Sequence, residues 1–184
     1  MQETYRKTVT LVLGGVRSGK SRYAVKLASQ ASRVVFLATA KPSDAEMRAK
    51  IERHQEERPT QWLTIEEPLA LDRVLKQQDS GNQLFLIDCL TLFASNLLEA
   101  EAGNEGALRE RVARFCVALQ SISSSVVLVS NEVGSGVVPD YAVGRQFRDL
   151  AGEMNQNVAA LADTVLLMVA GLPIVLKGQL EVAP

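Results

Sequence analysis

The chain has 184 residues, 47% of them hydrophobic, and a formal net charge of −1. This length suits a single domain with a buried core, so we expect one domain over residues 1–184. The near-zero charge gives no electrostatic footprint for nucleic acid, and no apolar stretch approaches the roughly 20 residues of a membrane span. Residues 1–7 are polar and do not resemble a signal peptide. We therefore expect a cytoplasmic protein with no nucleic-acid partner and no membrane span.

The first feature along the chain is a strand that leads into a glycine-rich loop. Residues 8–13 are β-branched and apolar, which predicts a buried strand, and residues 21–28 lack Gly and Pro, which favours a helix. Between them lies an octapeptide with the spacing G-x-x-x-x-G-K-[ST]. Its residues are Gly14, Gly15, Val16, Arg17, Ser18, Gly19, Lys20 and Ser21. This spacing is that of a phosphate-binding loop (P-loop).

The chemistry of this loop requires those residue types. Glycines let backbone N–H groups turn inward around phosphate oxygens, and the helix N-terminus adds partial positive charge. Lys20 is expected to reach the β- and γ-phosphates, and Ser21 to hold Mg²⁺. The alternative is a Gly-rich turn that carries Lys-Ser without function. The complete motif and both flanks favour a protein that binds a nucleoside triphosphate.

The only histidine follows on a predicted helix over residues 44–58. His54 and Arg58 continue the helical stripe of Met47 and Ile51, so all four side chains share one face. A single histidine on such a face is usually a hydrogen-bonded core residue. A neighbouring arginine, however, favours the neutral imidazole, which is the nucleophilic form. Both readings stay open from the spacing alone.

The remaining pattern alternates strands and helices. Strands are predicted over residues 34–38, 84–87, 126–129 and 165–169, with a possible edge hairpin over 174–176 after a turn at 171–173. Helices are predicted over residues 68–78, 91–101, 107–123 and 144–162. Apolar strands separated by helices predict an α/β fold, namely a mostly parallel sheet with helices on both faces. The P-loop makes that fold P-loop nucleoside triphosphate hydrolase-like (RecA-like).

Ligands of such sheets gather at the carboxyl ends of the strands. Asp88 closes one apolar strand, where an acidic residue can hold Mg²⁺ through water, or alternatively can cap the helix before Thr91. Asn131 and Glu132 end another strand, where the carboxylate could orient a substrate hydroxyl or satisfy turn backbone. Two isolated cysteines, in a strand and in a helix, are predicted to be buried thiols rather than a disulfide or a metal site. They are Cys89 and Cys116.

Several segments together carry a family resemblance. They are residues 14–21, 38–40, 51–59, 62–68, 129–134, 138–139, 145–149, 152 and 155–156. Over nearly the whole chain, these segments resemble the bifunctional adenosylcobinamide kinase / adenosylcobinamide-phosphate guanylyltransferase family of cobalamin biosynthesis. The P-loop is generic, whereas His-x-x-x-Arg-Pro followed by Trp-x-Thr-x-Glu is specific.

The resemblance implies two reactions. One phosphorylates a hydroxyl of adenosylcobinamide with ATP or GTP. The other forms a guanylylated histidine from GTP and passes GMP on, which gives adenosylcobinamide-GDP. The resemblance also implies a homotrimer with its sites near subunit contacts.

The resemblance further assigns residues. The covalent residue maps onto His54, and Lys20 would serve catalysis beside it. Nucleotide contacts map onto the P-loop octapeptide and onto Ala38, Thr39, Ala40, Gln55, Glu56, Glu57, Arg58, Glu66 and Asp88. The chain departs from the family pattern at Arg53, where a second His is found in some members, at Asp88, often Glu, and at Ala40, commonly Ser. These departures concern single contacts and nucleotide preference.

Two other functions remain possible from the sequence. One is a small-molecule P-loop kinase without guanylyl transfer, in which His54 is structural. The other is a nucleotide-dependent regulatory ATPase, against which the short chain offers no evident arginine finger. Pro42 and Pro59 bound the segment with His54, so this segment is expected either to swing as one unit on GTP binding or to be fixed.

Overall fold

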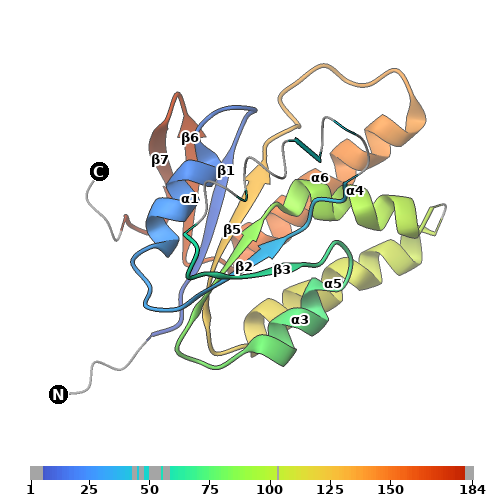
Figure 1. Ribbon diagram of the computed structural model, residues 1–184. Helices are drawn as coiled ribbons and strands as arrows, with labels where there is room; N and C mark the ends of the chain where they lie inside the picture. The colour runs from blue at the N-terminus through green and yellow to red at the C-terminus, as the bar shows by residue number, and fades with distance from the viewer. Residues whose placement is uncertain are drawn as a thin grey trace.

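The computed structural model describes residues 6–42, 45, 48–49, 55, 59–102 and 104–180. In these ranges seven strands form one sheet in the order β3-β2-β4-β5-β1-β6-β7 (Figure 1). The strands are β1 Val9–Gly14, β2 Val34–Ala38, β3 Leu63–Glu66, β4 Leu84–Asp88, β5 Ser125–Asn131, β6 Thr164–Val169 and β7 Leu172–Lys177. All neighbouring strands pair in parallel except β6 and β7, which are antiparallel. The predicted fold class, including the carboxyl-terminal edge hairpin, is confirmed.

Helices cover both faces of this sheet (Figure 1). The described helices are α1 Lys20–Ala28, α3 Leu71–Gln78, α4 Leu90–Ala100, α5 Glu105–Ser121 and α6 Ala142–Leu161. Alternate residues of each strand face opposite sides, as the pleat requires. On β1, Leu11 packs in the core beneath α3, α4, α5 and α6, whereas Val12 packs in the second core beneath α1.

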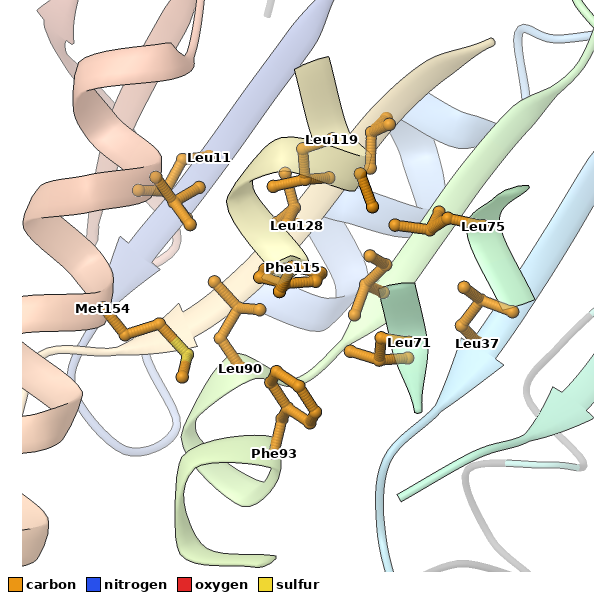
Figure 2. Close-up of a cluster of buried hydrophobic side chains, with 14 of the residues drawn as sticks. Leu11, Leu37, Leu71, Leu75, Leu90, Phe93, Phe115, Leu119, Leu128 and Met154 are labelled. Carbon is orange, nitrogen blue, oxygen red and sulfur yellow. The ribbon is translucent and has the colours of Figure 1, made fainter. Parts of the chain in front are cut away.

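The larger core lies between the sheet and the four helices α3 to α6, and Figure 2 shows its central side chains. Phe93 of α4 and Phe115 of α5 are both fully buried, with ring centroids 5.2 Å apart in a tilted pair. Leu71 and Leu75 of α3 reach into the same cluster from one helix face. This core fixes the strands on which the candidate site is built.

Two details differ from the sequence prediction. Strand β3 was not predicted, because three of its four residues are exposed and only backbone pairing with β2 makes it a strand. The hairpin turn consists of Ala170 and Gly171, since Val169 pairs with Leu172. Pro173 therefore lies within β7 rather than in the turn. Proline fits there because β7 is an edge strand, where a residue without an N–H is tolerated.

The carboxyl ends of six parallel strands meet at one edge of the sheet. In register, Gly14 of β1 lies opposite Asn131 of β5, and Ala38 of β2 lies opposite both Asp88 of β4 and Glu66 of β3. The strand ends singled out in the sequence therefore meet at this edge. Ligands of parallel sheets bind there.

Candidate functional site

The P-loop connects β1 to α1 at the carboxyl edge of the sheet. Gly19, with φ of 96°, is the N-cap residue of α1 and provides no capping side chain. The first N–H groups of α1 are thus left for another acceptor, which makes the helix start an anion site. Arg17 also has a positive φ, 56°. Such backbone is typical of ligand-binding loops, where nearby structure holds it in place.

Lys20 lies inside the loop rather than in solvent. Its side chain is buried, with 8% of the residue exposed, and its ammonium donates to the carbonyl of Gly15 at 2.6 Å. The hydroxyl of Ser18 is buried and has no hydrogen-bond partner within the described residues. The loop thus gathers an ammonium, an unpaired hydroxyl and helix N–H groups, which is the chemistry that phosphate oxygens require.

The predicted Mg²⁺ ligands, Ser21 and Asp88, lie on elements that pack against each other. Ser21 lies in the first turn of α1, which packs across β5 and β4, and Asp88 ends β4. Cys89, not Asp88, takes the N-cap position of α4, so the capping alternative for Asp88 does not apply. No group of three or more His, Cys, Asp or Glu suited to a metal occurs in the part of the chain described. Mg²⁺ bound to a nucleotide needs only one or two protein ligands besides phosphates and waters.

Thr39 joins the ends of β2 and β4. The residue is fully buried; its hydroxyl accepts the N–H of Cys89 at 2.8 Å and donates to the carbonyl of Cys89 at 2.7 Å. The side-chain amide of Asn96 donates to the carbonyl of Thr39 at 2.8 Å. Thr39 was expected to contact nucleotide; in the structure its side chain holds the backbone directly after Asp88.

The end of β5 is held close to the P-loop. The N–H of Glu132 donates to the carbonyl of Gly14 at 3.0 Å. The carboxylate of Glu132 accepts the N–H of Gly134 at 2.6 Å, so of its two sequence-based readings the structure has the turn-stabilising one. Two side chains, one from α4 and one from α6, also hold the end of β5. Their contacts are not predicted from the sequence, because they join segments far apart along the chain. The two residues are Thr91, whose hydroxyl accepts the N–H of Asn131, and Asn155, whose amide donates to the carbonyl of Asn131.

A second group of predicted residues lies near β3. The amide of Gln55 donates to the carboxylate of Glu66, the last residue of β3, at 3.1 Å. Other predicted residues of that segment lie outside the described residues, together with most of the predicted helix over 44–58. They are His54, Glu56, Glu57 and Arg58.

Both cysteines are free thiols, as predicted, but only Cys89 is buried, since Cys116 is half-buried. Burial, together with the nearby charge of Asp88, raises the pKa of Cys89 to about 11, and burial also raises the pKa of Cys116. Neither is therefore a thiolate near neutral pH, and neither suits a nucleophile. Among the described helices, none combines the length and apolar content needed to cross a membrane.

Known proteins resemble this chain over most of its length. Residues 10–176 match the family described as cobinamide kinase / cobinamide phosphate guanyltransferase. The bifunctional adenosylcobalamin biosynthesis protein CobU of Escherichia coli (strain K12) is 39% identical over 178 residues, covering 91% of this chain and 98% of that protein. The bifunctional adenosylcobalamin biosynthesis protein CobP of Pseudomonas aeruginosa is 41% identical over 175 residues, covering 92% and 97%.

Solved structures show the fold at a greater distance. A prototypical ATPase from the type III secretion system of pathogenic bacteria superposes with a TM-score of 0.58 at 11% identity. The match covers 87% of this chain and 50% of that chain. At this identity the likeness concerns the fold only.

Proposed function

The chain belongs to the cobinamide kinase / cobinamide phosphate guanyltransferase family, and on that premise we propose that it is a bifunctional enzyme of cobalamin biosynthesis. Its kinase reaction transfers the γ-phosphoryl group of ATP or GTP to a hydroxyl of adenosylcobinamide. Its second reaction transfers GMP from GTP to the resulting phosphate, which gives adenosylcobinamide-GDP. The observation that carries this conclusion is the P-loop at the carboxyl edge, with the buried ammonium of Lys20 against its backbone.

Residues of the P-loop serve both reactions in this proposal. Phosphoryl-type transfers gain most of their rate from positioning and from stabilising charge on the phosphates. The N–H groups at the start of α1 and the ammonium of Lys20 bind those oxygens. Ser21 and Asp88 hold Mg²⁺, which neutralises further phosphate charge when it is bound with the nucleotide.

His54 is the proposed covalent residue of the second reaction. An imidazole nitrogen attacks the α-phosphorus of GTP, an N–P bond forms, and the bond from that phosphorus to the bridging oxygen breaks to release pyrophosphate. A phosphate oxygen of the phosphorylated corrinoid then attacks the same phosphorus and releases His54. Gln55, the next residue in sequence, contacts Glu66 at the carboxyl edge, which supports a site that includes this segment.

Further nucleotide contacts are proposed around these groups. They are the remaining P-loop residues Gly14 to Gly19, together with Ala38, Thr39, Ala40, Gln55, Glu56, Glu57, Arg58 and Glu66. The polar groups of Thr39 already bond within the protein: its hydroxyl to Cys89, its N–H to the carbonyl of Asp88 and its carbonyl to the amide of Asn96.

Covalent labelling tests the histidine. The chain incubated with α-labelled GTP and Mg²⁺ should become labelled, and His54→Asn should not. The adduct should survive mild base and be lost in acid, as a phosphoramidate is. His54→Asn should still phosphorylate cobinamide from γ-labelled ATP, which serves as the control for folding. Labelling of His54→Asn at the level of the unsubstituted chain would refute the assignment, and a chain that phosphorylates without ever being labelled is a kinase alone.

We propose that the second reaction also involves movement of the segment with His54. The sheet order puts four strand steps between β3, which carries the Gln55 contact, and β1, which leads to the P-loop, or about 19 Å at about 4.8 Å per step. An attacking nitrogen must come within roughly 3–3.5 Å of the α-phosphorus. We therefore propose that residues 42–59 close over the P-loop when GTP binds. Hydrogen exchange across this stretch should slow with a non-hydrolysable GTP analogue and Mg²⁺; unchanged exchange at saturation would refute the movement.

We also propose that the chain forms one domain and assembles as a homotrimer in the cytoplasm. The single sheet that joins all seven strands supports one domain. The edge strand β7 exposes Leu172, Ile174 and Leu176, which suits burial against another subunit. Light scattering after size-exclusion chromatography should give three times the mass of the 20.0 kDa chain. A monomer at micromolar concentration would contradict the trimer.

A further inference from the structure

The turn of the β6–β7 hairpin lies directly against the P-loop. The N–H of Gly171, the second turn residue, donates to the carbonyl of Ser18 at 3.0 Å. Ala170 and Gly171 both have positive φ, 51° and 83°, as the turn of a two-residue hairpin loop requires. The hydrogen bond joins parts of the chain about 150 residues apart, and strand order alone brings them together, because β6 pairs with β1.

The two backbones are in close contact at this point. A Cβ atom added to Gly19 would lie 3.2 Å from the Cα of Gly171, which is tighter than ordinary van der Waals contact. A Cβ atom added to Gly14 would lie 2.6 Å from the carbonyl oxygen of Met168 in β6. The hairpin therefore supports the P-loop at both of its ends, and neither glycine can take a side chain without displacing it.

The hydrogen bond determines which way one peptide group points. The peptide unit that joins Ser18 to Gly19 is planar and trans, so its C=O and its N–H point in opposite directions. The N–H of Gly171 holds the Ser18 carbonyl toward the hairpin. The N–H of Gly19 must then point away from the hairpin. A P-loop binds phosphate through N–H groups oriented in this way.

We propose that Gly171 is a positioning residue of the nucleotide site, which holds the Ser18–Gly19 peptide with its N–H directed to the phosphates of the bound triphosphate. This inference rests on the proposed nucleotide-binding function and adds a residue that lies outside every nucleotide-binding motif of the chain. It acts through its backbone N–H and its positive φ, not through contact with the ligand.

Gly81 provides a matched control. It also has a positive φ, 77°, and its N–H also donates hydrogen bonds, to Asp79 and Ser124. It lies just before β4, at the amino ends of the parallel strands, whereas the P-loop lies at their carboxyl ends. The nearest atom to an added Cβ is 3.6 Å away at both Gly81 and Gly171. Equivalent substitutions at the two positions therefore impose similar backbone strain.

The first pair of variants is Gly171→Pro and Gly81→Pro, each of which removes an N–H donor and excludes the positive φ. Binding of a fluorescent GTP analogue with Mg²⁺ and the thermal midpoint are measured on the full chain. We expect Gly171→Pro to raise the Kd about tenfold, the effect of about 1.4 kcal/mol. Gly81→Pro should change the Kd less than twofold at a comparable loss of thermal stability. Guanosine has no phosphate, so its own dissociation constant, obtained by competition with the analogue, should be the same for both variants.

A milder pair applies if a proline variant does not fold. Gly171→Ala and Gly81→Ala keep the N–H and strain the backbone alone. Gly171→Ala should raise the Kd more than Gly81→Ala does, and Gly171→Asn, which tolerates positive φ, should restore it. Equal binding by the unsubstituted chain and the Gly171 variants would overturn this inference alone. Failure of the unsubstituted chain to bind the analogue would instead overturn the proposed function, and this inference with it.

Discussion

Thr39 is the residue whose substitution tests the carboxyl edge most directly. Its hydroxyl both accepts the N–H of Cys89 and donates to the carbonyl of Cys89, and the residue is fully buried. Thr39→Val keeps the shape of the side chain but removes both hydrogen bonds. The carbonyl of Cys89 retains a partner, because the N–H of Phe93 also donates to it at 3.1 Å. The N–H of Cys89 is the group that loses its partner.

The magnitude follows from this difference. A buried polar group left without a partner costs about 1–3 kcal/mol, so Thr39→Val should lower the free energy of unfolding by about 2 kcal/mol. Thr39→Ser keeps the hydroxyl and loses one buried methyl group, which should cost about 1 kcal/mol. If the hydrogen bonds matter, Thr39→Ser should therefore be more stable than Thr39→Val. Loss of apolar contact alone would make Thr39→Val the more stable variant.

Urea unfolding followed by circular dichroism measures both free energies. Thr39→Val should also weaken Mg²⁺-dependent binding of GTP, because the hydrogen bonds from Thr39 to Cys89 hold the backbone directly after Asp88. If Thr39→Val proves as stable as Thr39→Ser, with an unchanged slope against urea, the two hydrogen bonds between Thr39 and Cys89 do not stabilise the fold.

Three further predictions follow from single residues. Lys20→Ala should lose both activities, with about 1.5–3 kcal/mol less triphosphate binding, as titration with GTP and both activity assays will measure. Burial raises the pKa of Asp79, but hydrogen bonds from the hydroxyl of Ser124 and from three backbone N–H groups outweigh burial and lower that pKa below its ordinary value of 3.8. The stabilisation by Asp79 is therefore present above pH 4 and lost as the pH falls through the lowered pKa. The free energy of unfolding, measured in urea, should change less between pH 6 and pH 3 for Asp79→Asn than for the unsubstituted chain. Cys89, with a pKa of about 11, should resist iodoacetamide at pH 8 in the folded protein and react once urea unfolds it, as mass spectrometry of the peptides will show.

Local patterns explain why most of the fold could be predicted from the sequence. Buried parallel strands are continuous apolar runs, so β1, β2, β4, β5 and β6 were evident. Strand β3 was missed because it is an edge strand whose residues Leu63 and Thr64 are exposed, which leaves no periodic signal. The sequence predicts the hairpin turn over residues 171–173, whereas the turn consists of Ala170 and Gly171. Gly171 and Pro173 are both turn formers, and only the pairing with β6 decides between them.

The candidate site was likewise only partly predictable from the sequence. The P-loop was predictable because all its residues adjoin in sequence. For Asp88 the structure removes the capping alternative, because Cys89 is the N-cap of α4, and the Mg²⁺ role stays a prediction. The supports from Thr39, Asn155 and Gly171 could not be predicted, because each bonds to a segment that only the strand order brings near.

The same strand order distinguishes the demands of the two proposed reactions. Transfer of a γ-phosphoryl group requires the P-loop and Asp88, which lie on β1 and β4 with only β5 between them. Attack at the α-phosphorus by His54 also requires the segment whose residue Gln55 contacts Glu66 on β3, at the far end of the sheet. In our proposal the first reaction therefore uses neighbouring strand ends, whereas the second also brings the segment near β3 to the P-loop. If both reactions use one P-loop, as we propose, closure of residues 42–59 would commit a bound GTP to guanylyl transfer rather than to phosphorylation.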